Sequence, residues 1–209
     1  MKPARQRVIY LHGFNSSPAS QKARLFTAYC HQQGLRDVVV PALSHDPALA
    51  MQSIEALMGD QGRGVALLVG SSLGGYYATH LAEQYGLKAA LINPAVAPCD
   101  HLPDTIIGRH RNQYTHEEYD FTPEHVAFLR TLEVKKISEP SRYLLLVQTG
   151  DATLDCRLAV ALYAGCEQVV QEGGSHSFDN FDAVLPRILR FADLTPPAPH
   201  PSEQARARH

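Results

Sequence analysis

Short apolar runs alternate with longer stretches of mixed polarity along the chain. The apolar runs have the length of β-strands and lie at residues 8–11, 37–41, 65–70, 89–93, 143–148 and 168–171. The stretches between them have helical length and lie at about residues 20–33, 48–58, 72–85, 154–164 and 178–193. Strands that alternate with helices predict a mainly parallel sheet with helices on both faces. We therefore expect an α/β fold with six strands, in a single domain over residues 1–194.

Two segments interrupt this alternation. Residues 95–140 mix His, Tyr, Glu and Pro with short helical patterns and are too long for an ordinary connection. We expect them to form a small helical cap over the site. Residues 195–209 are rich in Pro and contain no apolar residue larger than Ala or Pro, so they predict a flexible tail.

Composition excludes several classes of partner. With a formal net charge of -2, the 209-residue chain has no basic stripe for nucleic acid and no polybasic segment for anionic lipid. No apolar run approaches membrane-spanning length, and the run at 8–11 is too short for a signal peptide. The four cysteines form no Cys-x-x-Cys pair. These features predict reduced thiols, a cytoplasmic location and a small-molecule partner, and they leave the oligomeric state open.

A Gly-x-Ser-x-Gly motif is centred on Ser72, between an apolar run and a stretch of helical length. A serine on a sharp strand-to-helix turn needs neighbours without Cβ atoms, which Gly70 and Gly74 provide. This context is typical of the nucleophilic serine of α/β-hydrolases. We therefore expect an α/β-hydrolase-like three-layer sandwich in which Ser72 is the nucleophile.

A serine hydroxyl becomes an effective nucleophile when a base accepts its proton and a carboxylate orients that base. His176 follows the sixth predicted strand in the segment Gly-Gly-Ser-His, which matches the chain order Ser, acid, His of this fold. Two acids follow the fifth strand, and of these Asp151 lies at the strand end, where active groups of parallel sheets gather. Asp155 is suited to the first turn of the next helix. The pattern favours Asp151, with helix capping as the alternative role for either acid.

The loop after the first strand begins with His12 and Gly13. In α/β-hydrolases this loop supplies one backbone N–H of the oxyanion hole, and the residue after the nucleophile supplies the second. We therefore expect the amides of Phe14 and Leu73 to hold the oxyanion. The alternative role for His12 and Gly13 is a simple turn after a strand.

The separated motifs support a family resemblance. The segments His-Gly-Phe-Asn-Ser-Ser-Pro, Gly-Ser-Ser-Leu-Gly-Gly, Ile-Asn-Pro-Ala-Val, Gln-Thr-Gly-Asp and Glu-Gly-Gly-Ser-His-Ser-Phe resemble, in order and spacing, the YqiA-like bacterial esterases, a small α/β-hydrolase family. The resemblance extends from Val8 to about Leu194. It implies hydrolysis of carboxylic esters, including short-chain aryl esters, and of acyl-CoA thioesters. It also implies that Ser72, Asp151 and His176 form the triad.

The sequence thus predicts a serine esterase or thioesterase that works through an acyl-enzyme. A C–C bond hydrolase of the same fold and a catalytically silent ligand-binding module are the alternatives. The charged residues near His116 have no His-Glu-x-x-His spacing, so no metal site is expected, and triad chemistry needs no organic cofactor. The substrate, its acyl length and the choice between ester and thioester stay open.

Overall fold

A single sheet forms the centre of the computed structural model, which describes residues 7–101 and 106–194. The sheet contains six strands in the order β2-β1-β3-β4-β7-β8, and every neighbouring pair is parallel. The strands are β1 (Arg7–Leu11), β2 (Val38–Val39), β3 (Val65–Ser71), β4 (Ala89–Ile92), β7 (Tyr143–Gln148) and β8 (Glu167–Gln171). This arrangement confirms the predicted fold class. The tail expected at 195–209 lies outside the described residues.

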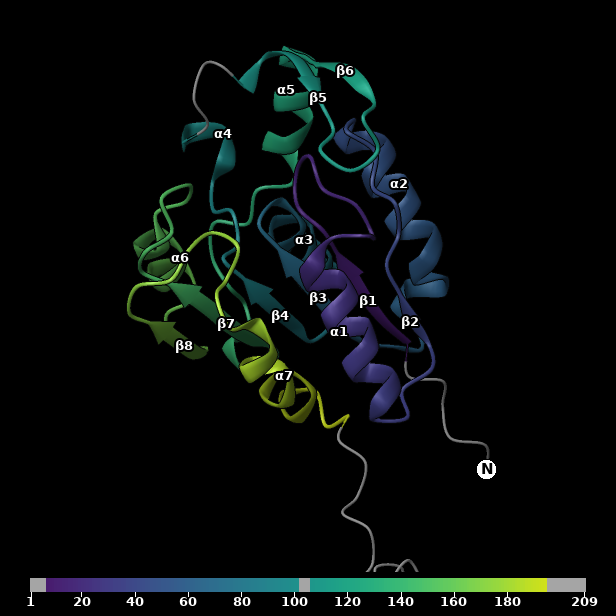
Figure 1. Cartoon of the computed structure of the whole chain (residues 1–209), viewed down its shortest axis with the longest axis vertical. Coiled ribbons are helices and arrows are strands. Elements are labelled where there is room, and N and C mark those ends of the chain that lie inside the picture. The colour runs from purple at the N-terminus through teal and green to yellow at the C-terminus, as the bar shows by residue number, and fades with distance from the viewer. Residues whose placement is uncertain (1–6, 102–105, 195–209) are drawn as a thin grey trace, which may run out of the picture.

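Helices cover both faces of the sheet (Figure 1). One face packs against α1 (Gln21–Gln32) and α7 (Leu185–Phe191), and the other against α2 (Pro47–Met58), α3 (Leu73–Tyr85) and α6 (Cys156–Leu162). Alternate residues of a strand therefore enter different cores, as Val8 and Ile9 do. Because both faces are buried, the central strands are apolar almost throughout.

One predicted helix begins later than expected. The sequence predicts a helix over residues 178–193, but the chain instead forms a turn, the short 3-10 helix η4 (Phe181–Val184) and then α7. Phe178 and Asn180 have φ angles of 63° and 55°, in the left-handed region. A right-handed helix cannot pass through such residues. Two further 3-10 turns, η1 (Asp60–Gly62) and η3 (Pro140–Arg142), precede β3 and β7.

We term residues 95–140 the insert, of which residues 98–101 and 106–131 lie beyond the carboxyl ends of the strands (Figure 1). The insert contains α4 (Pro98–His101), an antiparallel hairpin of β5 (Gly108–Arg111) and β6 (Glu118–Phe121), and α5 (Pro123–Thr131). The expected helices are thus accompanied by a hairpin that the sequence analysis missed. In β6, Tyr119 and Phe121 are buried while Glu118 and Asp120 are exposed, which is the two-residue period of a half-buried strand.

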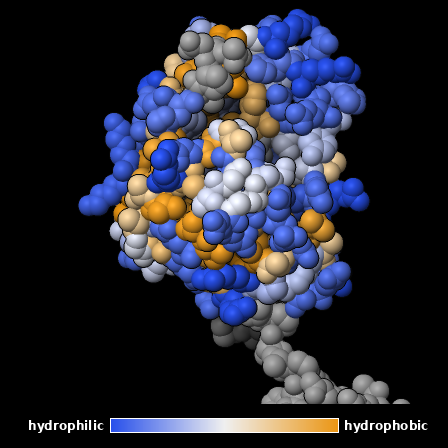
Figure 2. All heavy atoms as spheres, turned by 60° about the vertical axis from the view of Figure 1, so that its left-hand side comes forward, coloured by the Kyte–Doolittle hydropathy of each residue, from blue (hydrophilic) through white to orange (hydrophobic). Residues whose placement is uncertain are grey.

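The surface has no continuous apolar face in the view of Figure 2, where hydrophobic residues gather mainly over the middle and hydrophilic residues surround them. Among the helices of the described residues, none combines the length and the apolar character that crossing a membrane requires. The four cysteines are unpaired thiols.

Candidate active site

Ser72 occupies a strained turn between β3 and α3. Its φ and ψ angles are 56° and -123°, a conformation that a residue with a Cβ atom rarely adopts. The Ser72 N–H donates to the carbonyl of Ile92 at 3.0 Å, and the Ser72 carbonyl accepts from the amides of Gly75 at 2.9 Å and Ala95 at 3.1 Å. These backbone hydrogen bonds fix the turn to the end of β4 and to the start of the insert.

The turn is possible because two backbones approach very closely. A Cβ atom on Gly70 would lie 2.3 Å from the carbonyl oxygen of Gly74, and one on Gly74 would lie 2.1 Å from the carbonyl oxygen of Leu11. Neither position can hold a side chain without movement of the backbone. The glycines that the motif analysis singled out thus let α3 begin directly against the end of β1.

The structure brings Ser72, His176 and Asp151 together. His176 Nε2 lies 3.1 Å from Ser72 Oγ, and His176 Nδ1 lies 2.7 Å from Asp151 Oδ2. The Asp151 side chain is 2% exposed, whereas that of His176 is 31% exposed. A buried carboxylate on one nitrogen and an accessible hydroxyl on the other can hold the ring with its proton on Nδ1, which leaves Nε2 free to accept a proton.

The two candidate acids occupy different environments. Asp151 Oδ1 accepts from the amides of Thr153 at 2.8 Å and Leu154 at 2.9 Å, so both of its oxygens have donors. Burial raises the pKa of the Asp151 carboxyl, but the hydrogen bonds from His176 and from these amides outweigh burial, and the net pKa is lowered. Asp155 instead caps α6 and pairs with Arg157. Of the two acids, only Asp151 contacts His176.

The loop that carries His176 is fixed by two polar side chains from neighbouring strand ends. Gln148 Oε1 accepts from the amides of Ser175 at 3.0 Å and Asp179 at 2.8 Å. Asn93 Nδ2 donates to the carbonyls of Ser175 at 3.0 Å and His176 at 3.2 Å, while its Oδ1 accepts from the Gln148 amide. Both residues are 3% exposed. The sequence analysis assigned no role to either, although a polar residue that ends an apolar strand was an available signal.

His12 holds the loop after β1. Its Nε2 accepts from the amide of Leu43 at 3.1 Å, so its proton resides on Nδ1, which donates to the Gly13 carbonyl at 3.0 Å. Burial lowers the pKa of the His12 imidazole, which favours this neutral form. The loop geometry thus depends on an uncharged His12.

Phe14 and Leu73 lie beside Ser72. Both residues and Ser72 line one cavity of about 500 Å³. Neither amide finds a hydrogen-bond acceptor among the described residues. Two unpaired N–H groups on residues that line the cavity at a serine can stabilise negative charge on a carbonyl oxygen bound there.

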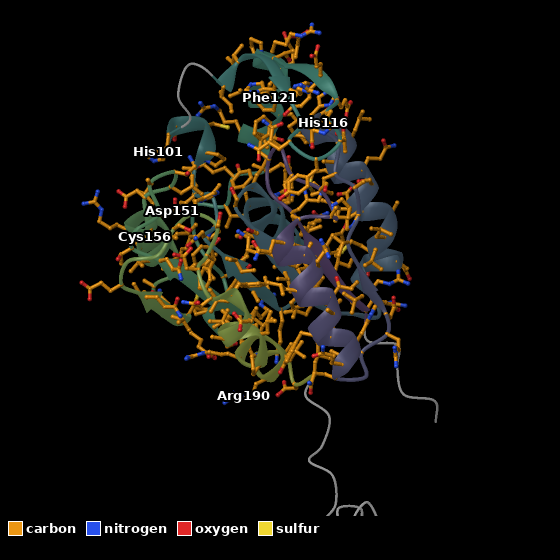
Figure 3. The ribbon with its side chains drawn as sticks, viewed as in Figure 1. His101, His116, Phe121, Asp151, Cys156 and Arg190 are labelled. Carbon is orange, nitrogen blue, oxygen red and sulfur yellow. The ribbon has the colours of Figure 1, made fainter. Side chains whose placement is uncertain are left out.

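The Phe14 ring contacts the insert. It packs edge-on against His110 and Phe121, with ring centroids 5.3 Å away in both cases. A hydrogen bond from Asn112 Nδ2 to the Ser16 carbonyl, at 3.0 Å, joins the insert to the same loop. In Figure 3, Asp151 lies on the sheet side of the site and Phe121 lies on the insert side.

Residues 7–193 match the family model described as Uncharacterised protein family (UPF0227). The chain belongs to UPF0227. A UPF0227 protein of Serratia proteamaculans is 24% identical over 192 residues, which are 90% of this chain and 99% of that protein. The YcfP protein of Salmonella paratyphi A, also of UPF0227, is 25% identical over 192 residues, with the same shares of the two chains. These matches confirm the resemblance to YqiA-like proteins.

Solved structures of other proteins share the fold. A putative hydrolase from Agrobacterium vitis superposes with a TM-score of 0.70 at 19% identity, covering 90% of this chain and 88% of that chain. Est1E from Butyrivibrio proteoclasticus superposes with a TM-score of 0.66 at 19% identity, covering 91% and 88%. At this identity the likeness establishes an α/β-hydrolase fold.

Removing the side-chain amide of Gln148 should increase the mobility of the loop that carries His176. In Gln148→Leu the amides of Ser175 and Asp179 lose their buried acceptor, which should lower the free energy of unfolding by about 1–3 kcal/mol. Urea denaturation measures this loss, and amide hydrogen exchange should become faster across residues 173–179.

Gln168→Leu is the matched control, because Gln168 donates to the carbonyls of Val160 and Tyr163, away from this loop. It should leave exchange at 173–179 unchanged. Equal exchange of the loop in both variants would contradict the role given to Gln148.

Proposed function

We propose that the protein is a serine hydrolase that cleaves carboxylic esters or thioesters with Ser72, His176 and Asp151 as its triad. The observation that carries the proposal is the continuous chain of contacts from Asp151 Oδ2 to His176, at 2.7 Å, and from His176 to Ser72 Oγ, at 3.1 Å. The strained backbone of Ser72 adds support, because such strain concentrates at functional sites. The esterase domain of a Rhodothermus marinus protein, which shares the fold with a TM-score of 0.62 at 19% identity, is in keeping with this chemistry.

Acylation begins when His176 Nε2 accepts the proton of Ser72 Oγ as that oxygen attacks the carbonyl carbon. Negative charge moves to the carbonyl oxygen, where the amides of Phe14 and Leu73 donate to it. The tetrahedral intermediate then collapses, and the bond from carbon to the leaving oxygen or sulfur breaks. His176 gives its proton to the leaving group, so an alcohol or thiol departs and the acyl group stays on Ser72.

Deacylation repeats these steps with water. His176 accepts a proton from water, the hydroxide attacks the acyl carbon, and Ser72 Oγ leaves and regains the proton. The products are a carboxylic acid and the free enzyme. Asp151 keeps its negative charge throughout and stabilises the imidazolium. The cycle balances without a metal or an organic cofactor.

The insert acts in this proposal as a cap that selects the acyl group. The cavity of about 500 Å³ at Ser72 is walled on one side by Ile106, Phe121 and Leu129 of the insert and on the other by Leu154 and Leu158. An apolar cavity of this kind fits an acyl chain. The four free cysteines suit a reducing compartment, and we place the protein in the cytoplasm.

Ser72→Ala should abolish turnover, because no other hydroxyl contacts His176 Nε2 within the described residues. The expected loss in kcat on an aryl ester is about 10³-fold or more. Labelling by a fluorophosphonate probe should disappear as well. The matched control is Ser71→Ala, which should still be labelled. If Ser71→Ala loses labelling while Ser72→Ala keeps it, Ser72 is not the nucleophile. If the probe does not label the wild type, a catalytically silent binding module is favoured.

Asp151→Asn should lower kcat by about 10³-fold or more, since an amide can donate to His176 and stabilise the wrong tautomer. The same substitution at Asp155 keeps an oxygen that can cap α6 and should change kcat little. Circular dichroism establishes that both variants fold. A severe kinetic defect in Asp155→Asn together with a mild one in Asp151→Asn would reverse the two roles.

Ile106→Ala should change the preference for acyl length, because Ile106 lines the acyl cavity. Removing its methyl groups should shift discrimination between neighbouring acyl lengths by roughly 1–3 kcal/mol in kcat/KM. The adjacent Ile107, which is 46% exposed and does not line this cavity, provides the control Ile107→Ala. An unchanged acyl profile in Ile106→Ala, with normal probe labelling, would mean that the insert does not select the substrate.

A further inference from the structure

A second cavity opens on the other side of Ser72. It has a volume of about 220 Å³, and its wall differs in character from that of the acyl cavity. Hydroxyl, amide and amine groups line it, from residues that include Tyr10, Ser20, Lys22, Gln113 and Tyr114. The nucleophile therefore lies between an apolar cavity and a polar one.

The position of His176 distinguishes the two cavities chemically. His176 lines the polar cavity together with Ser72, whereas the acyl cavity contains Ser72 but not His176. In triad chemistry the imidazole must reach the leaving oxygen to give it a proton. The leaving group of a bound ester consequently lies on the side of His176, in the polar cavity, and the acyl chain lies in the apolar one.

The polar cavity has a positive charge that no carboxylate among its described lining residues balances. Within the described residues that line it, Lys22 is the one lysine or arginine, and none is Asp or Glu. Lys22 Nζ donates to the carbonyls of Ser177 at 3.0 Å and His176 at 3.4 Å. An ammonium group has three N–H donors, so one remains for a ligand.

Lys22 stays cationic at neutral pH. Burial lowers the pKa of its ammonium to about 8, and the negative charge of Asp151 opposes that effect. A cation that is partly withdrawn from water, with no carboxylate beside it in the cavity, is well suited to hold an anion, because interactions between charges strengthen as water is excluded.

We propose that the preferred leaving group is a compact alcohol or thiol that carries an anionic group, and that Lys22 binds this anionic group in the polar cavity. This inference rests on the proposed function. A carboxylate or a phosphate would supply the charge. The cavity volume of about 220 Å³ restricts the leaving group to a small molecule. The substrate class is thus an apolar acyl group joined to a small acidic alcohol or thiol.

The test compares esters that share one acyl group and differ in whether the leaving group carries an anionic group. The meta and para isomers of acetoxybenzoate are each paired with the uncharged acetoxybenzamide, and acetoxyphenyl phosphate is paired with phenyl acetate. The readout is the ratio of kcat/KM for the anionic ester to that for its neutral partner. This ratio cancels any effect that a substitution has on the position of His176.

Lys22→Met should lower the ratio at least about tenfold for one or more of the pairs, and Lys22→Arg should largely preserve it. Added salt should also lower the wild-type ratio, because it screens the attraction between ammonium and anion. Arg24→Met removes the same charge from the exposed surface of α1, outside the cavity, and should leave the ratio unchanged.

Other outcomes overturn the proposal. If Lys22→Met slows charged and neutral esters equally, Lys22 only supports the loop of His176. If the carboxylate and phosphate pairs all give the same ratio in wild type and Lys22→Met, no anion is recognised there. Both results leave ester hydrolysis intact. Failure of the proposed function is separate, because the wild type would then hydrolyse no neutral ester and the fluorophosphonate probe would not label Ser72.

Discussion

The strained turn at Ser72 is the constraint on which the geometry of the site depends. The start of α3 can lie against the end of β1 only because Gly74 has no side chain, since a Cβ atom there would meet the Leu11 carbonyl at 2.1 Å. This close approach places Ser72 beside the loop of Phe14. Backbone packing thereby brings Ser72, the loop of Phe14 and the start of α3 together.

The parallel sheet explains how residues far apart in the chain meet. Every strand ends at the same edge, so the segments that follow β1, β3, β4, β7 and β8 all reach one place. Asn93 and Gln148, which are almost wholly buried, then join the last of these segments to its neighbours through hydrogen bonds. A loop with two glycines would otherwise sample many conformations, and these buried contacts select the one that points His176 at Ser72.

The sequence was most informative where one physical cause dominates. Strands buried on both faces are visible as apolar runs, and the sharp turn at Ser72 is visible through its glycines. The late start of α7 was missed because Phe178 and Asn180 adopt left-handed conformations, which their residue types do not predict. The choice of Asp151 over Asp155 rested on position, and the folded chain has Asp155 at the N-cap of α6, the helix end to which its place in the sequence suited it. Lys22 resembled any lysine on an amphipathic helix, because its cavity forms between distant segments.

The contacts of Phe14 limit how this protein could evolve new substrate preferences. Phe14 lines the cavity at Ser72, and its ring packs against His110, Phe121 and Tyr119 of the insert. Substitutions that reshape the insert would therefore also shift Phe14, whose amide is the proposed donor to the oxyanion. The insert is not an exchangeable module. New substrate preferences in such an architecture would have to arise by small coordinated changes on both sides of that ring, since a wholesale replacement would sacrifice rate along with selectivity.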